Sequence, residues 1–154
     1  MDGWRRVLVA ALIVSSIGGA LCRAEELPTG GAPPIPLKHF PDRLHAFVWR
    51  NWELVSLKRM AEVLQITPQN VRDIGLLMGL PPQIPPPAEY QQRGYITIIR
   101  RNWHLLPYEQ LLTLLGWDAQ KLAFTLREDD FLWIKLGSLK PACVPIRYAE
   151  PNEA

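Results

Sequence analysis

One motif recurs in this chain at an offset of 51 residues, and this repeat limits the possible folds more than any other feature. Arg50-Asn51-Trp52 returns as Arg101-Asn102-Trp103. Similar residues follow both copies at the same offset: Leu54 and Leu105, Met60 and Leu111, Leu64 and Leu115, Gln69 and Gln120, Val71 and Leu122. Such a repeat indicates one supersecondary unit used twice.

The first copy reads as three short helices. Its apolar residues fall at helical spacing. Ser56 and Thr67 are good N-cap residues for the second and third helices, and Gly79 followed by Pro81 ends the third. We therefore expect a helical unit in residues 41–80.

The second copy predicts the same plan. A first helix around Trp103 is followed by Pro107, which opens a second helix that ends at Gly116. Asp118 then caps a third. Different residues thus do the same local work as in the first copy, which strengthens the prediction of a second unit in residues 90–137.

The segment after the third helix of the second copy is open to two interpretations. The acidic residues Glu128, Asp129 and Asp130 either cap a fourth helix, with Phe131 and its neighbours Ile134 and Leu136, or precede a strand. The tail, residues 138–154, contains three prolines after Lys140, and we expect it to be extended.

Proline-rich segments divide the chain. Residues 25–40 form a leader rich in proline and glycine, and residues 81–89 hold five prolines that favour a stiff, polyproline-like link. The predicted fold is therefore mostly α: two tandem trihelical, helix-turn-helix-like repeat units joined by a Pro-rich linker. Units this small gain stability by packing together.

The N-terminus has the pattern of a secretory signal peptide. Arg5 and Arg6 precede an apolar run shorter than the ~20 residues of a membrane span. Small residues at Cys22 and Ala24 suit a signal peptidase, so residues 1–24 are expected to be removed after Ala24 and the protein exported to the periplasm or outside the cell. A lipid anchor at Cys22, an uncleaved anchor and a cytosolic protein are the alternatives; the membrane is expected to be reached only through this signal.

The charge of the predicted mature chain is balanced. The whole chain has 17 basic and 15 acidic residues, and residues 1–24 hold three of the basic and one of the acidic ones. The remaining 14 and 14 give no electrostatic reason to expect nucleic acid as a partner. Cleavage would also leave Cys143 as a single cysteine, which we expect to be an inert, packed thiol.

Each unit resembles the trihelical helix-turn-helix domain. The positions where that family packs its central helices hold Ala61, Leu64, Ile66 and Val71. The resemblance implies that, in a DNA-binding protein, four side chains would face the base edges: Gln69, Asn70, Arg72 and Asp73. Their counterparts in the second copy do not form a basic face: Gln120, Lys121, Ala123 and Phe124. The resemblance therefore favours a structural use of the same helix packing. DNA binding is the last of the three functional hypotheses for this chain.

The second copy also has a weaker resemblance to LysM, a glycan-binding module of strand-helix-helix-strand order. Residues 95–99 and 131–136 would be its strands. The usual Gly-Asp-Thr turn is replaced by Asn102-Trp103-His104. A LysM-like binder of cell-surface glycan is the second functional alternative.

Longer phrases resemble the N-terminal region of large exported bacterial proteins, which carry carbohydrate-active or uncharacterised domains further along. These phrases are residues 95–108 and 126–137, and the resemblance covers residues 36–148. It implies an exported, non-catalytic interaction or accessory module. The expected partner is another protein, another domain of a longer chain, or a glycan.

The repeated motif supplies the candidate ligand-binding residues, which are Trp49, Arg50, Trp52, Arg101 and Trp103. Tryptophan faces stack on the apolar face of sugar rings, and the arginines would add polar contacts. Alternatively, Trp52 and Trp103 fill the core of each unit while Asn51 and Asn102 bond backbone groups at the corner. Because the counterpart of Trp49 is Arg100, Trp49 is the better candidate for an exposed contact.

No pattern in the sequence predicts catalysis. His39, His45 and His104 lack metal-ligand spacing, and adjacent carboxylates cannot flank a substrate as acid and base. Gly-rich phosphate loops and Gly-x-Ser-x-Gly elbows are missing from the sequence. We expect no enzyme activity, no cofactor and no metal.

Overall fold

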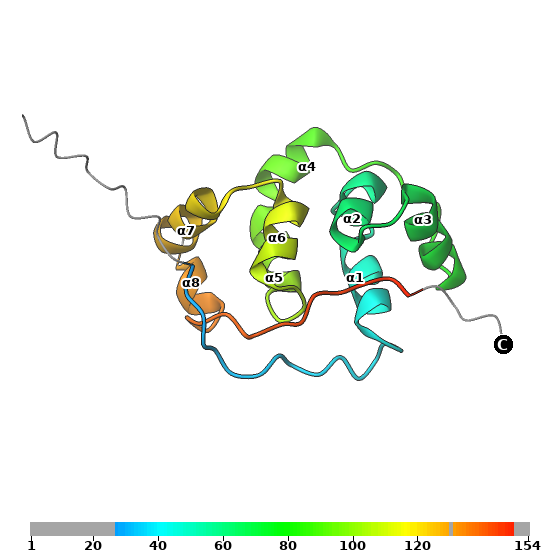
Figure 1. The fold of residues 1–154 in the computed structure, drawn as a ribbon. Coiled ribbons are helices and arrows are strands. Elements are labelled where there is room, and N and C mark those ends of the chain that lie inside the picture. Colours follow the sequence, from blue (N-terminus) through cyan, green and yellow to red (C-terminus); the bar gives the residue numbers. More distant parts are fainter. Residues whose placement is uncertain (1–26, 130, 150–154) are drawn as a thin grey trace, which may run out of the picture.

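The computed structural model describes residues 27–129 and 131–149, and the described part of the chain forms eight helices and no strand (Figure 1). The helices are α1 (Arg43–Asn51), α2 (Leu57–Leu64), α3 (Pro68–Leu77), α4 (Ala88–Arg93), α5 (Tyr95–Asn102), α6 (Tyr108–Leu115), α7 (Ala119–Glu128) and α8 (Leu132–Lys135). The prediction of a mostly α fold is therefore confirmed.

The helix bounds follow the offset of the sequence motif. Helices α2 and α6 have eight residues each and begin at Leu57 and Tyr108. Helices α3 and α7 have ten residues each and begin at Pro68 and Ala119. Both pairs are 51 positions apart, and α1 and α5 end on the paired residues Asn51 and Asn102.

The helix ends are set by the capping residues expected from the sequence. The side chains of Ser56, Thr67 and Asp118 each accept a hydrogen bond from a backbone N–H in the first turn of α2, α3 and α7. Helix α6 ends at Gly116, with φ at 66°. The corresponding residue after α2 is Gln65, which takes the same left-handed conformation without the freedom of glycine.

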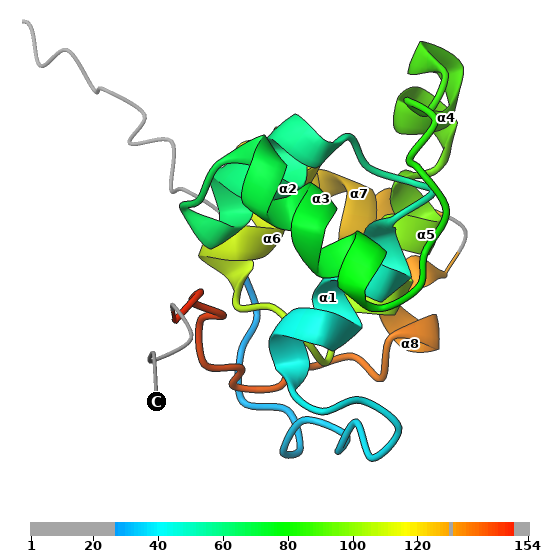
Figure 2. The same ribbon diagram turned by 90° about the vertical axis from the view of Figure 1, so that its right-hand side faces the viewer.

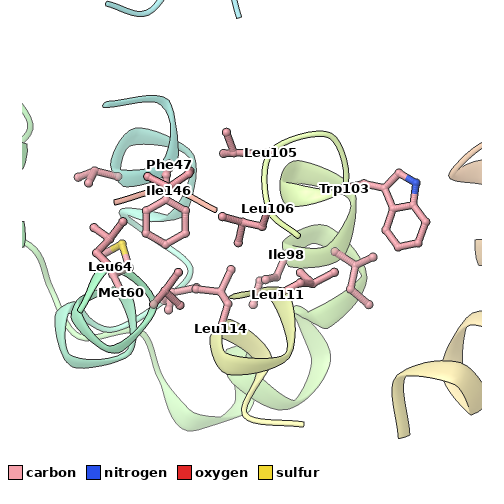
Figure 3. Close-up of a cluster of buried hydrophobic side chains, with 14 of the residues drawn as sticks. Phe47, Met60, Leu64, Ile98, Trp103, Leu105, Leu106, Leu111, Leu114 and Ile146 are labelled. Atoms are coloured by element: carbon pink, nitrogen blue, oxygen red, sulfur yellow. The ribbon is translucent and has the colours of Figure 1, made fainter. Parts of the chain in front are cut away.

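Both halves of the chain contribute to one hydrophobic core. Helix α2 packs against α6, and α1 packs against α5. Figure 3 shows side chains of the first half meeting those of the second half: Phe47, Met60 and Leu64 with Ile98, Leu111 and Leu114. Because the two halves cover each other's apolar side chains, each half buries more apolar surface than it would alone.

Two extended segments run beneath the helices. The leader and the tail meet where Gly31 N donates to Lys140 O at 3.2 Å (Figure 1). Further along, the Gln110 side chain clamps Ile146, because its Nε2 donates to Ile146 O at 2.7 Å and its Oε1 accepts from Ile146 N at 2.8 Å. Residues 141–149 of the tail form no helix and no strand.

Helix α4 is a feature that the sequence analysis missed. It covers residues 88–93, across the expected boundary between the linker, 81–89, and the second unit. It has no side-chain N-cap and projects from the body of the molecule (Figure 2). Because it is short and lacks a long apolar stripe, periodicity alone does not reveal it.

The segment after α7 is helical, so the strand alternative for residues 131–136 is wrong, as is the LysM-derived strand at residues 95–99, which lies in α5. The expected cap of this fourth helix is also wrong, because the N-cap residue of α8 is Phe131, with φ at 54° and no side-chain bond. Asp129 instead accepts a hydrogen bond from the Tyr95 hydroxyl. Leu132 is buried, whereas Phe131 and Ile134 are exposed.

The predicted signal peptide, residues 1–24, lies outside the described residues. Within residues 27–129 and 131–149, no helix is long and apolar enough to cross a membrane.

Candidate ligand-binding site at the α1–α5 contact

A reciprocal pair of asparagines joins α1 to α5. Asn51 Nδ2 donates to Asn102 Oδ1 at 3.0 Å, and Asn102 Nδ2 donates to Asn51 Oδ1 at 2.8 Å. The second N–H of each amide goes one turn back, to Phe47 O and Ile98 O, each at 2.8 Å. Both side chains are fully buried, and these bonds use every amide N–H. Both asparagines bond backbone groups, as one alternative expected, but within their own helices and not at the corner; the bond between them was not foreseen.

The preceding arginines repeat this reciprocity nearer the surface. One terminal nitrogen of Arg50 donates to Arg101 O at 2.8 Å, and one of Arg101 donates to Arg50 O at 2.7 Å. Each guanidinium thus lies at the C-terminal end of the opposite helix, where positive charge is favourable. Burial, with a smaller contribution from Arg101, lowers the pKa of Arg50.

An open depression lies beside these arginines. Its volume is about 470 Å³, and its lining residues are Trp49, Arg50, Thr97, Arg100 and Arg101. Trp49 is 52% exposed and rests against Phe40, with ring centroids 5.6 Å apart. Helices α1 and α5 therefore place an indole and three guanidinium groups around one concave surface.

The depression is rich in positive charge. Among the residues that the structure describes, no carboxylate forms an ion pair with Arg50, Arg100 or Arg101. A guanidinium is always charged at neutral pH and presents its N–H groups in a planar fork that fits carboxylate, sulfate or phosphate. The arrangement can therefore hold an anionic group beside an exposed aromatic face.

The structure divides the five candidate ligand-binding residues into two groups, those that line the depression and those that are buried in the core. Trp49, Arg50 and Arg101 lie around the depression. Trp52 and Trp103 are only 3% and 1% exposed, so neither offers a ring face to a sugar, and the core-filling alternative describes both. Trp52 Nε1 donates to Pro81 O at 2.9 Å, whereas Trp103 Nε1 is buried and has no hydrogen-bond partner in the described part of the chain.

Sequence reasoning missed two lining residues, Thr97 and Arg100. The sequence contains a signal for each of these two residues. Thr97 lies four residues before Arg101 and therefore shares a face of α5 with it. Arg100 occupies the position that the 51-residue offset pairs with Trp49, and their presence in one depression follows from the reciprocal contact of the two helices.

Corresponding corners of the two halves are closed by unlike side chains. Gln83 Nε2 donates to Trp52 O and Val55 O, at the turn between α1 and α2. Lys140 Nζ donates to Trp103 O and Leu106 O, the equivalent carbonyls between α5 and α6. A neutral amide thus fills one corner, and a charged ammonium, only 2% exposed, fills the other.

Three of the four positions expected to read DNA form hydrogen bonds within α3 or with its N-cap residue. Gln69 Nε2 donates to Asp73 Oδ1 at 2.7 Å. Asn70 completes a capping box with Thr67. The side chains of Gln69, Asn70 and Asp73 are therefore used in the helix itself, and the depression lies on α1 and α5 instead.

Comparison with known proteins adds no family to this geometry. No protein-family model, curated protein or solved structure matches the chain. Its function is therefore inferred from the arrangement of its own side chains, above all those around the α1–α5 depression.

Proposed function

We propose that this chain is an exported, non-catalytic interaction module that binds an acidic cell-surface glycan in the α1–α5 depression. The observation that carries the proposal is the grouping of Arg50, Arg100 and Arg101 with the exposed ring of Trp49. A uronic acid residue has an apolar ring face and a carboxylate. The indole suits the ring face, and an arginine fork suits the carboxylate.

The proposal includes a tandem architecture: two trihelical units, residues 41–80 and 90–137, joined by the Pro-rich linker 81–89. Its support is the equal length and 51-residue spacing of α2 and α6, and of α3 and α7. The Asn51–Asn102 bonds are reciprocal, as in the isologous interface of a two-fold dimer. The ligand site then arises where the two units meet.

Export follows from the predicted signal peptide, with cleavage after Ala24. An exported protein meets cell-wall and extracellular polysaccharides directly. The module would anchor or orient an attached domain of a longer chain, or a separate protein partner, on such a surface. This role needs no cofactor, no metal and no catalytic group in the module itself.

The glycan proposal does not depend on the LysM resemblance, because residues 95–99 lie in α5 and residues 132–135 form α8. DNA is the competing ligand, since an arginine-lined surface also attracts phosphate. The depression has a volume of about 470 Å³ and is lined by residues of α1 and α5, not of α3, so an isolated acidic sugar fits it better than a duplex does.

Affinity electrophoresis in gels containing polygalacturonate, a neutral glucan or duplex DNA tests the proposal. The acidic glycan should retard the protein, and Trp49→Ala and Arg100→Glu should each weaken binding at least tenfold. Phe124→Ala and Arg72→Glu are the matched controls, because they remove an exposed aromatic ring and an exposed arginine elsewhere. Arg50 and Arg101 are left intact because they bond the helix ends.

Three outcomes would count against the proposal. These are equal retardation by charged and neutral glycans, equal losses in the control variants, and tighter binding to duplex DNA. Circular dichroism and thermal unfolding of each variant would show that a loss of binding is not a loss of fold.

A further inference from the structure

Lys140 and Cys143 form a close pair of reactive groups that the proposed glycan site does not use. Lys140 Nζ lies 3.8 Å from Cys143 Sγ, and the sulfur is 3.9 Å from Trp103 O. Nζ also bonds Trp103 O, so both groups are held beside the same carbonyl. Cys143 is partly exposed and therefore open to small oxidants, whereas Lys140 is almost completely buried.

The surroundings of Lys140 favour its neutral amine more than those of a surface lysine. Nζ lies over the rings of Trp103 and Tyr108, 5.2 and 5.4 Å from their centroids. No carboxylate among the described residues pairs with it. Burial lowers the pKa of Lys140, and Arg43 lowers it further, although Cys143 acts in the opposite direction.

We propose that peroxide converts Lys140 and Cys143 into a covalent pair joined by a bond between Nζ and Sγ. The Cys143 thiolate attacks hydrogen peroxide and becomes a sulfenic acid, and the hydroxide that leaves takes up the proton lost by the thiol and is released as water. The neutral amine of Lys140 then attacks the sulfur, and the hydroxyl group leaves as a second water after taking a proton from the nitrogen. In sum, one thiol, one amine and one peroxide give one sulfenamide and two waters.

The bridge would change how the tail is held. An amine bound to sulfur no longer supplies an ammonium to Trp103 O and Leu106 O, and unpaired buried carbonyls are costly. The C-terminal segment should therefore loosen from the turn between α5 and α6. The corresponding turn of the first half should not respond, because Gln83 closes it with an unreactive amide.

Peptide mapping of the peroxide-treated full chain tests the bridge. The background carries Cys22→Ser, so that the other cysteine of the sequence cannot form a disulfide with Cys143. The expected product is a peptide lighter by two hydrogens, with fragment masses that place the link between Lys140 and Cys143. A thiol reductant should reverse it.

Two variants isolate the role of the amine. Lys140→Gln copies the group that closes the first corner, and its Cys143 sulfenic acid should persist and be trapped by dimedone. Cys143→Ser should give neither bridge nor trapped adduct. Thermal unfolding checks that Lys140→Gln is folded, and the fragment masses of the unsubstituted pair provide a test that does not depend on that variant.

The proposal is overturned if Cys143 of the folded protein accumulates as sulfinic acid or as an intermolecular disulfide without a linked peptide. A link from Cys143 to another lysine would also overturn it. A bridge heavier by one oxygen would overturn the direct nitrogen–sulfur bond.

Discussion

Asn51 and Asn102 hold α1 and α5 together through two side-chain hydrogen bonds that run in opposite directions between the same two amides. The pair is fully buried, and each amide also bonds its own helix. It therefore ties the ends of two helices to a single relative position, and the lining of the proposed glycan site depends on that position.

Replacing one member of this pair should be costly. Asn51→Ala leaves the Asn102 amide buried with a lost partner, and we expect a loss of about 2 kcal/mol in the free energy of unfolding. The double variant with Asn102→Ala should lose less than the sum of the two single losses, because the surviving partner is gone as well. Urea unfolding of all four proteins measures the coupling, and Gln69→Ala serves as the exposed control. Strictly additive losses would contradict the pairing.

The two tryptophans that follow the asparagines should behave unlike Trp49. Trp103→Ala removes a fully buried ring, and we expect a loss of about 3–5 kcal/mol. Trp49→Ala removes a half-exposed ring and should cost far less stability while weakening glycan binding. Thermal unfolding and affinity electrophoresis of the same samples separate the two effects. A large stability loss in Trp49→Ala would show that its ring serves mainly as packing.

Gly75 in α3 should resist replacement by alanine. Alanine usually stabilises a helix interior by about 1 kcal/mol relative to glycine. Here, however, the added Cβ would overlap the six-membered ring of Trp52. We expect Gly75→Ala to lower stability, and to lower it much less in a Trp52→Leu background, where that ring is absent. Equal effects in both backgrounds would place the strain elsewhere.

Acidification should destabilise the protein through His104. Burial lowers the pKa of His104, with further lowering from Lys140 and Arg50. The unfolded chain therefore binds the proton more readily, so stability should be full above the ordinary histidine pKa of about 6.5 and fall as the pH drops from there toward the lowered folded value. Protonation also removes the Nδ1 acceptor used by Ile35 N. Urea unfolding between pH 7 and pH 5 should show a smaller decline for His104→Gln than for the unsubstituted chain.

Local structure could be predicted from the sequence because local chemistry determines it. Ser56, Thr67 and Asp118 cap helices as expected, because a side-chain oxygen three residues before a free N–H needs no distant partner. Gly116 ends α6 for a similarly local reason, the ease with which glycine adopts positive φ.

Pairings between distant segments could not be predicted in this way. The repeat marked Asn51 and Asn102 as equivalent, but equivalence does not say that they touch. The burial of Lys140 had no local signal at all, since its acceptors belong to a turn more than 30 residues earlier. Nor did helical spacing show that Phe131 would face solvent while Leu132 faced the core, because a four-residue helix has too few turns to define a face.

Gln83 and Lys140 also bear on where each half of the molecule is complete. Both side chains come from non-helical segments that follow the helices whose corner they close. A chain cut after α8 would keep all eight helices and lose the ammonium that satisfies Trp103 O and Leu106 O. A fragment meant to fold by itself should therefore extend past α8 to include Lys140. An expression boundary drawn at the end of α8 would leave Trp103 O and Leu106 O without this hydrogen-bond donor.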